Sequence, residues 1–241
     1  MMSPFELIDR ARTGDQAALA RLVTAIESGE SDVVAALGSF SGEGQASRIG
    51  ITGPPGAGKS TLIGAIITEL RSRSLTVAVL AVDPSSPLTG GALLGDRIRM
   101  QDHVEDPGVY VRSMASRGHL GGLAVAAGAT IDLLANAGFD YVLVETVGVG
   151  QSEVEVMDLV DLVVLVVGPG WGDQIQAEKA GIVEIAGLYV VNKGDRTGVD
   201  EVRIALLGAA GESGPEVLTT TASTGEGVAA LVDAMDRLVG S

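Results

Sequence analysis

The stretch from residue 49 to residue 61 constrains this chain more than any other part of its sequence. It reads Ile-Gly-Ile-Thr-Gly-Pro-Pro-Gly-Ala-Gly-Lys-Ser-Thr and contains the pattern Gly-x-x-x-x-Gly-Lys-Ser. Glycines let backbone N–H groups converge on phosphate oxygens, lysine supplies a positive charge to the β- and γ-phosphates, and the serine hydroxyl can bind Mg²⁺. A strand-like run precedes the pattern and a helical run follows it, as the motif requires. The stretch therefore predicts a binding site for a nucleoside triphosphate.

The phosphates are expected to contact the loop and the first turn of the following helix, whose dipole favours anions. The expected contacts are Gly53, Gly56, Ala57, Gly58, Lys59, Ser60 and Thr61. Lys59 is also expected to stabilise charge on the transferred phosphoryl group. The alternative is a glycine-rich turn with an accidental Lys-Ser pair, which the agreement between motif and flanks disfavours.

Composition narrows the function classes. With no Cys in 241 residues, disulfide frameworks and thiolate metal sites are excluded. A net charge of −15 argues against general affinity for nucleic acid, which needs clustered Lys and Arg. The most apolar run, residues 159–167, is too short to span a bilayer, and no secretory signal is recognisable. We therefore expect a cytoplasmic protein that binds neither a membrane nor nucleic acid.

The spacing of apolar residues changes early in the chain. Helical spacing over residues 5–11 and 15–28, with Asp15 as the N-cap of the second segment, predicts two helices. Residues 39–46 are typical of a linker. We therefore expect two parts, a helical N-terminal extension over residues 1–46 and a domain that carries the phosphate loop (P-loop) over residues 47–241.

From Arg48 onward, short apolar runs alternate with helical segments. Strands are expected at residues 48–52, 76–82, 109–112, 140–145, 161–167, 188–192 and 216–219. This alternation predicts an α/β fold with a mainly parallel, doubly wound sheet and helices on both faces. Ligands bind such sheets at the carboxyl ends of the strands, so the motifs that follow strands should meet at one edge.

A second motif, Asn-Lys-Gly-Asp at residues 192–195, follows the apolar run 188–191. In this position it resembles the guanine-specificity motif of GTPases. The Asp195 carboxylate can accept from guanine N1–H and the 2-amino group together, whereas adenine presents an acceptor at N1 and no 2-amino group. Asn192 is expected to brace the loop and the base, and the stem of Lys193 to lie over the base plane. The motif therefore favours GTP and GDP over ATP.

Two further loops are expected to complete the nucleotide site. Thr221, Ala222 and Ser223 follow a strand pattern, and the Ala222 N–H is expected to face guanine O6. Gly148 lies in a glycine-rich run after the strand at 140–145. Its N–H is expected to reach the γ-phosphate, which would make that loop sensitive to whether this phosphate is present.

Three acids are candidate ligands for Mg²⁺ or for its waters, together with Ser60. Asp83 and Glu145 each end a strand pattern, and Asp96 lies in a Leu-Gly-Asp-Arg run. The alternative for each acid is a helix cap or a turn, which the position at a strand end disfavours for Asp83 and Glu145. No water-orienting residue stands out. Candidates for a charge-stabilising finger are Arg97, Arg99, Arg112, Arg117 and Lys179.

Taken together, the motifs resemble those of the MeaB/ArgK-type GTPases of the SIMIBI class. The runs that carry the resemblance are AVDPSSP, GGALLGDRIRMQDH, RSMASRGHLGGLA, VETVGVGQSE, GWGDQIQAEKAGI and VVNKGD. That family serves adenosylcobalamin-dependent acyl-CoA mutases of the methylmalonyl-CoA mutase type. The resemblance implies GTP hydrolysis, gating of cofactor loading and protection of the mutase. It also implies Mg²⁺ ligation by Ser60, with Asp83, Asp96 and Glu145 in or near the metal shell.

The resemblance further implies three switch regions, at about residues 83–99, 145–153 and 168–182, of which the third relays the nucleotide state to the mutase. Two features depart from the family's pattern. Gly194 stands where the family usually has Ala, and a side chain there should point away from guanine, so we expect a looser loop with retained specificity. Longer members form a homodimer through a helical arm, and we expect that arm to be absent from a sequence that ends at Ser241.

Other function classes stay open. A related metallochaperone GTPase that inserts nickel would use Cys or His ligands, and this chain has no Cys and two His. An ATPase accessory to basic amino-acid transport, an older label of ArgK relatives, is disfavoured by the base motif. A module that binds nucleotide without turnover is disfavoured by the intact Lys59, Ser60 and acids. For a GTPase, we expect slow intrinsic hydrolysis that a partner stimulates.

Overall fold

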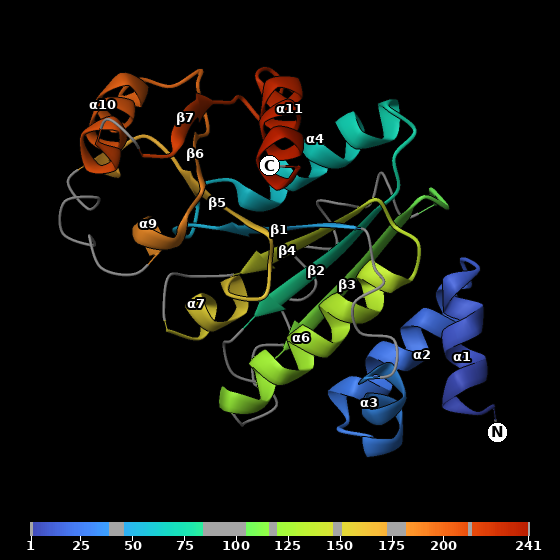
Figure 1. Ribbon diagram of the computed structural model, residues 1–241. Coiled ribbons are helices and arrows are strands. Elements are labelled where there is room, and N and C mark those ends of the chain that lie inside the picture. Colours follow the sequence, from blue (N-terminus) through green and yellow to red (C-terminus); the bar gives the residue numbers. More distant parts are fainter. Residues whose placement is uncertain are drawn as a thin grey trace.

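A parallel sheet forms the centre of the molecule (Figure 1). The computed structural model describes residues 2–38, 46–83, 105–115, 120–146, 151–172, 182–211 and 214–240. The strands are β1 Ser47–Thr52, β2 Val77–Asp83, β3 Val109–Ala115, β4 Tyr141–Thr146, β5 Leu162–Val167, β6 Leu188–Val191 and β7 Glu216–Thr219. They pair in parallel in the order β3-β2-β4-β1-β5-β6-β7. The predicted α/β fold is confirmed, and every expected strand is present.

Helices cover both faces of the sheet, as Figure 1 shows. On one face α4 Lys59–Ser72 and α11 Val228–Val239 pack against apolar side chains of the strands, including Ile49 and Ile51 of β1. On the other face lie α6 Leu120–Asn136, α7 Gln151–Met157, α9 Ile182–Ile185 and α10 Val199–Ala210, over side chains such as Val142 and Val144 of β4. Burial on both faces explains why the central strands are near-continuous runs of Val, Ile and Leu.

Three helices precede the sheet: α1 Pro4–Arg12, α2 Gln16–Glu27 and α3 Ser31–Gly38. The Asp15 side chain accepts from the N–H groups of Ala17 and Ala18, both at 3.0 Å, which confirms Asp15 as the N-cap of α2. The sequence analysis missed α3, because so short a segment holds too few apolar repeats for a helical period to stand out. All three helices contribute to the core that α6 also lines. The boundary between an extension and a GTPase domain stays a prediction.

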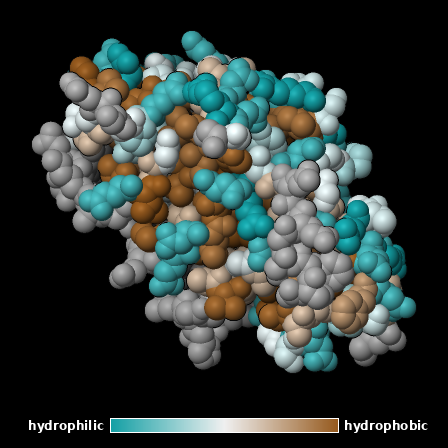
Figure 2. Space-filling model, viewed as in Figure 1, coloured by the Kyte–Doolittle hydropathy of each residue, from teal (hydrophilic) through white to brown (hydrophobic). Residues whose placement is uncertain are grey.

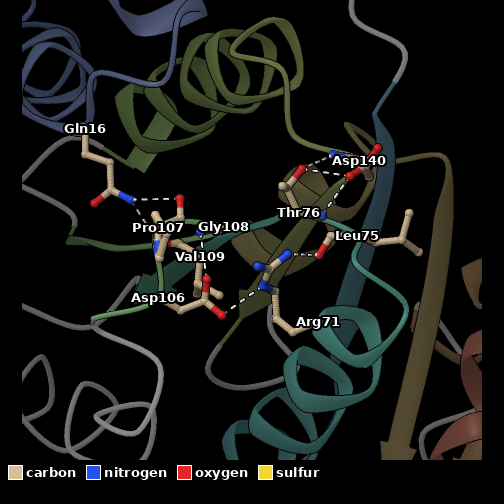
Figure 3. Close-up of polar contacts among 9 residues, drawn as sticks. All are labelled: Gln16, Arg71, Leu75, Thr76, Asp106, Pro107, Gly108, Val109 and Asp140. Carbon is tan, nitrogen blue, oxygen red and sulfur yellow. Dashed lines mark hydrogen bonds and ion pairs between the residues drawn. The ribbon is translucent and has the colours of Figure 1, made fainter.

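Polar contacts fix α2 to β3, the strand at one end of the sheet. Arg112 of β3 donates to Glu27 Oε2 at 2.8 Å. Gln16 Nε2 donates to the carbonyl oxygens of Pro107 at 3.4 Å and Val109 at 3.2 Å (Figure 3). The expectation that Arg112 is a candidate to stabilise charge on the phosphate is therefore corrected, because an acid of α2 holds its guanidinium.

A polar network closes the amino-terminal edge of the sheet (Figure 3). Arg71, near the end of α4, donates through Nε to Asp106 Oδ2 at 2.9 Å and through Nη1 to the Leu75 carbonyl at 2.8 Å. Asp140 Oδ2 accepts from the N–H and the hydroxyl of Thr76, at 2.7 and 2.8 Å. These contacts tie together the segments that enter β2, β3 and β4, and they leave the opposite edge to the phosphate loop.

Apolar surface stays open where α3 meets α6. A groove of about 440 Å³ lies there, with Val34, Val125 and Leu159 among its lining residues. Figure 2 shows apolar surface in the middle of the face that Figure 1 presents. Within the described ranges, no helix combines the length and the apolar character needed to cross a bilayer.

Candidate nucleotide-binding site

The phosphate loop, residues 53–58, joins β1 to α4 at the carboxyl edge of the sheet. Gly53 has a φ of 138° and Gly58 a φ of 94°, a backbone region that favours glycine. A Cβ on Gly53 would lie 1.9 Å from the carbonyl oxygen of Val166 in β5. The path of the backbone itself therefore requires the first and last glycines of the motif.

An ammonium, a hydroxyl and a carboxylate meet where α4 begins. Lys59 Nζ donates to the carbonyl oxygens of Gly53 at 2.7 Å and Pro54 at 3.2 Å. Ser60 Oγ donates to Oε1 of Glu145, the next-to-last residue of β4, at 2.8 Å. Glu145 is only 2% exposed. A buried carboxylate paired with a hydroxyl at a helix N-terminus is oxygen chemistry that fits Mg²⁺ and a phosphate chain.

The loop after β6 is tied to the phosphate loop and to the loop after β7. Asn192 Nδ2 donates to the Ala57 carbonyl at 3.0 Å. Asn192 Oδ1 accepts from Thr220 Oγ1 at 3.2 Å and from the Ala222 N–H at 3.1 Å. Because Asn192 is 2% exposed, these bonds form inside the protein and hold the three loops in one arrangement. Its expected contact with the base stays a prediction.

Lys193 and Asp195 lie beside this brace. Lys193 has a φ of 63°, uncommon for a residue other than glycine, and its Nζ donates to the Gly56 carbonyl at 2.6 Å. The lysine stem therefore spans from the loop after β6 (residues 192–195, called the base loop below) to the phosphate loop. Asp195 is exposed, so a ligand can reach its carboxylate.

The Ala222 N–H has a partner inside the protein, because it donates to Asn192 Oδ1. Its expected contact with guanine O6 stays a prediction. The bond to Asn192 forms because the loop after β7 approaches the buried Asn192 side chain. Thr220, the first residue of the same loop, also donates to Asn192 Oδ1. Thr220 reaches Asn192 because β6 pairs with β7, and no local sequence motif predicts that pairing.

Gly194 also differs from expectation, because the loop around it is tight and not loose. Its N–H donates to the Thr220 carbonyl at 2.9 Å. A Cβ added at Gly194 would lie 3.0 Å from both Thr219 Cγ2 and Thr221 Oγ1, inside ordinary contact distance. The base loop and the end of β7 therefore pack directly against each other at this glycine.

The topology brings most of the predicted site residues to the carboxyl edge of the sheet. Those among the described residues are Gly53, Gly56, Ala57, Gly58, Lys59, Ser60, Thr61, Glu145, Asn192, Lys193, Asp195, Thr221, Ala222 and Ser223. Asp83 ends β2, the neighbour of β4, so its backbone reaches the same edge. Asp96, Gly148 and Lys179 lie outside the described residues.

The family model described as "Methylmalonyl Co-A mutase-associated GTPase MeaB" matches residues 19–240. A putative GTPase of Pyrococcus horikoshii is 49% identical over 237 residues, which cover 92% of this chain and 74% of that protein. The mouse protein named methylmalonic aciduria type A homolog, mitochondrial, is 41% identical over 198 residues, which cover 78% of this chain and 48% of that protein.

Two solved structures are similar to this one. The crystal structure of an LAO/AO transport system kinase aligns with a TM-score of 0.76 at 32% identity, covering 98% of this chain and 74% of that one. The hydrogenase maturation factor HypB from Archaeoglobus fulgidus aligns with a TM-score of 0.61 at 17% identity, covering 92% of this chain and 99% of that one. At that low identity, the second match shows a shared fold alone.

Proposed function

Because this chain belongs to the MeaB family of methylmalonyl-CoA mutase-associated GTPases, we propose that it uses GTP to serve an adenosylcobalamin-dependent acyl-CoA mutase. The chain is a GTPase that converts GTP and water to GDP and phosphate. In the proposal, it gates the loading of the cofactor into the mutase and protects the mutase. The match of residues 19–240 to a family described by its association with that mutase carries the proposal.

Three loops that Asn192 holds together are proposed to bind the nucleotide: the phosphate loop, the loop after β6 and the loop after β7. The phosphate loop cradles the polyphosphate, and Lys59 exchanges its carbonyl acceptors on Gly53 and Pro54 for phosphate oxygens. Asp195 accepts from N1–H and the 2-amino group of guanine. Because Asn192 and Lys193 both bond to the phosphate loop, the two halves of the nucleotide are recognised by connected parts of the protein.

Mg²⁺ is the cofactor that fits the oxygen-rich side chains beside the phosphate loop. Ser60 and the buried Glu145 would hold the ion or its waters, with Asp83 at the adjacent strand end and Asp96 completing the set. When bound, the ion neutralises charge on the β- and γ-phosphates. The residues of this chain hold and orient the nucleotide.

Intrinsic hydrolysis is expected to be slow. Arg112 is held by Glu27, and the other proposed charge-stabilising residues, Arg97, Arg99, Arg117 and Lys179, lie outside the described residues. In GTPases of this kind, a charge-stabilising finger supplied by a partner accelerates hydrolysis by several orders of magnitude. The mutase is therefore proposed to stimulate hydrolysis as well as to respond to the nucleotide.

The alternatives have weaker support. Nickel delivery would require soft or imidazole ligands, and the chain has no Cys. Similarity to an LAO/AO transport system kinase raises a role as an ATPase in transport, but Asp195 is set to select guanine over adenine.

Binding of the chain to purified methylmalonyl-CoA mutase, measured in GDP and in a non-hydrolysable GTP analogue, tests the proposal. We expect the affinity to differ between the two nucleotides and the mutase to raise the rate of GTP hydrolysis. Lys59→Ala is the matched control, because it removes the phosphate contact and should abolish the nucleotide dependence. Equal, negligible binding in both nucleotide states would reject the partner and leave the GTPase activity standing.

A further inference from the structure

Gly194 lies at the contact between the base loop and the end of β7. A methyl group there would approach Thr219 Cγ2 and Thr221 Oγ1 at 3.0 Å and the Thr220 carbonyl oxygen at 3.3 Å. Gly194 is not among the glycines with a positive φ, so its backbone conformation does not itself demand glycine. The obstacle to a larger residue is space alone.

Thr219 is exposed, but the other two neighbours of Gly194, Thr220 and Thr221, are buried and have little freedom to move aside. Thr221 is 4% exposed and its N–H donates to the Glu226 carbonyl at 2.9 Å. The Thr221 carbonyl accepts from the N–H groups of Thr224 and Gly225, both at 3.0 Å. The segment facing Gly194 is therefore a hydrogen-bonded turn. Because it is closely packed, it would not shift easily to make room for a larger residue at position 194.

The base loop is held on its other side as well. Asn192, two residues before Gly194, is bonded to Ala57 of the phosphate loop and to Ala222. Asp195 follows Gly194 directly and is exposed. The steric overlap that a methyl group at residue 194 would cause would therefore be relieved mainly by displacing the part of the loop that carries Asp195.

We propose that Gly194 is a positioning residue that sets how far the Asp195 carboxylate stands from the phosphate loop and from the loop after β7, and thereby sets discrimination at the 2-amino group of guanine. This inference rests on the proposed role of Asp195 in the base pocket. It reverses the expectation of a loose loop, because here glycine allows close packing.

The test compares the dissociation constants of GDP and inosine diphosphate by calorimetry. Inosine diphosphate lacks only the 2-amino group, so the wild-type protein should prefer GDP by on the order of 10-fold to 100-fold. Gly194→Ala should weaken GDP binding by about 10-fold and lower this preference, because overpacking shifts the carboxylate. A general loss of folding would weaken both ligands by the same factor.

Two further variants separate space from other effects. Gly208→Ala on α10 is the matched control, because a Cβ there meets nothing within 4 Å and the preference should not change. Thr219→Ser removes Cγ2, so in the Gly194→Ala background it should restore part of the preference. Thr219→Ser alone should keep the wild-type preference. Thermal melting checks that each variant is folded, and the double variant carries the test if Gly194→Ala is not.

Two results would overturn the proposal: an unchanged preference in Gly194→Ala, or equal weakening of both ligands. Asp195→Asn distinguishes this failure from failure of the base pocket. A preference that survives Asp195→Asn would reject the pocket itself. A preference that Asp195→Asn abolishes and Gly194→Ala retains would reject only the role of Gly194.

Discussion

Asp195 lies exposed at the end of a loop whose preceding residues are fixed to the phosphate loop. Replacing its carboxylate by an amide leaves the shape and inverts half of the hydrogen-bonding capacity. Asp195→Asn should therefore weaken GTP binding by about 100-fold or more and favour xanthosine triphosphate, whose 2-oxo group accepts from the new amide. Calorimetry with both nucleotides measures this, and Asp200→Asn on α10 serves as the exposed control. Unchanged GTP affinity in Asp195→Asn would remove this residue from the base pocket.

Ser60 offers a second prediction for a single residue. Its hydroxyl donates to the buried Glu145, and both are proposed to hold Mg²⁺ or its waters. Ser60→Ala should reduce the gain in GDP affinity that Mg²⁺ provides by about 10-fold, because a ligand of the ion is lost. Titrations in Mg²⁺ and in EDTA separate this loss from effects on the phosphate loop. The control is Thr68→Ala on the same helix, and an undiminished Mg²⁺ effect in Ser60→Ala would contradict the assignment.

Among the elements, α2 depends on its N-terminal cap. The hydrogen bond from the Ala18 N–H, with help from Arg10, lowers the pKa of Asp15 below 3.8. A carboxyl with a lowered folded pKa contributes stability that is present above its unfolded pKa and lost as the pH falls through its folded pKa. In urea unfolding, the wild type should therefore be more stable than Asp15→Asn near neutral pH, and the difference should disappear once the pH falls below the folded pKa of Asp15. A difference that stays constant across this range would contradict the charged cap.

Helix α4 links the phosphate loop at its start to the network around Arg71 at its end. Arg71→Ala removes charge-assisted bonds to Asp106 and the Leu75 carbonyl, so it should lower the free energy of unfolding by about 1 to 2 kcal/mol. GDP affinity should be unchanged, because the network lies at the opposite edge of the sheet. Arg203→Ala, an exposed position on α10, should change stability by less than about 0.5 kcal/mol. A large loss of GDP affinity in Arg71→Ala would show that the two edges are coupled.

At the scale of the whole molecule, the segment after β5 connects the site to the core. A Cβ at Gly168 would lie 3.8 Å from Lys193 Cδ and 3.9 Å from Ala57 Cα, so the segment runs beside both loops. Trp171, three residues on, is 6% exposed and belongs to the hydrophobic core on the face of the sheet that α6, α7, α9 and α10 cover. Its emission should therefore differ between GDP and a non-hydrolysable GTP analogue if this segment responds to the γ-phosphate. Superimposable spectra at saturation would count against a nucleotide-responsive switch here.

The parallel sheet and the phosphate loop could be predicted from the sequence because their determinants are local. Buried strands are continuous apolar runs, and the loop needs glycine at Gly53 and Gly58 for its backbone path. The bonds from Thr220 and Ala222 to Asn192 could not be predicted, since they depend on the pairing of β6 with β7. The hydrogen bond from Arg112 to Glu27 could not be predicted either, because it joins segments that lie far apart in the sequence.

A crystal structure of the protein with GDP and Mg²⁺ tests the central claim most directly. The account predicts the diphosphate against residues 53–61, the ion beside Ser60 and Glu145, and the guanine edge against Asp195. Nucleotide density at any other place on the sheet, or a base turned away from Asp195, would contradict it.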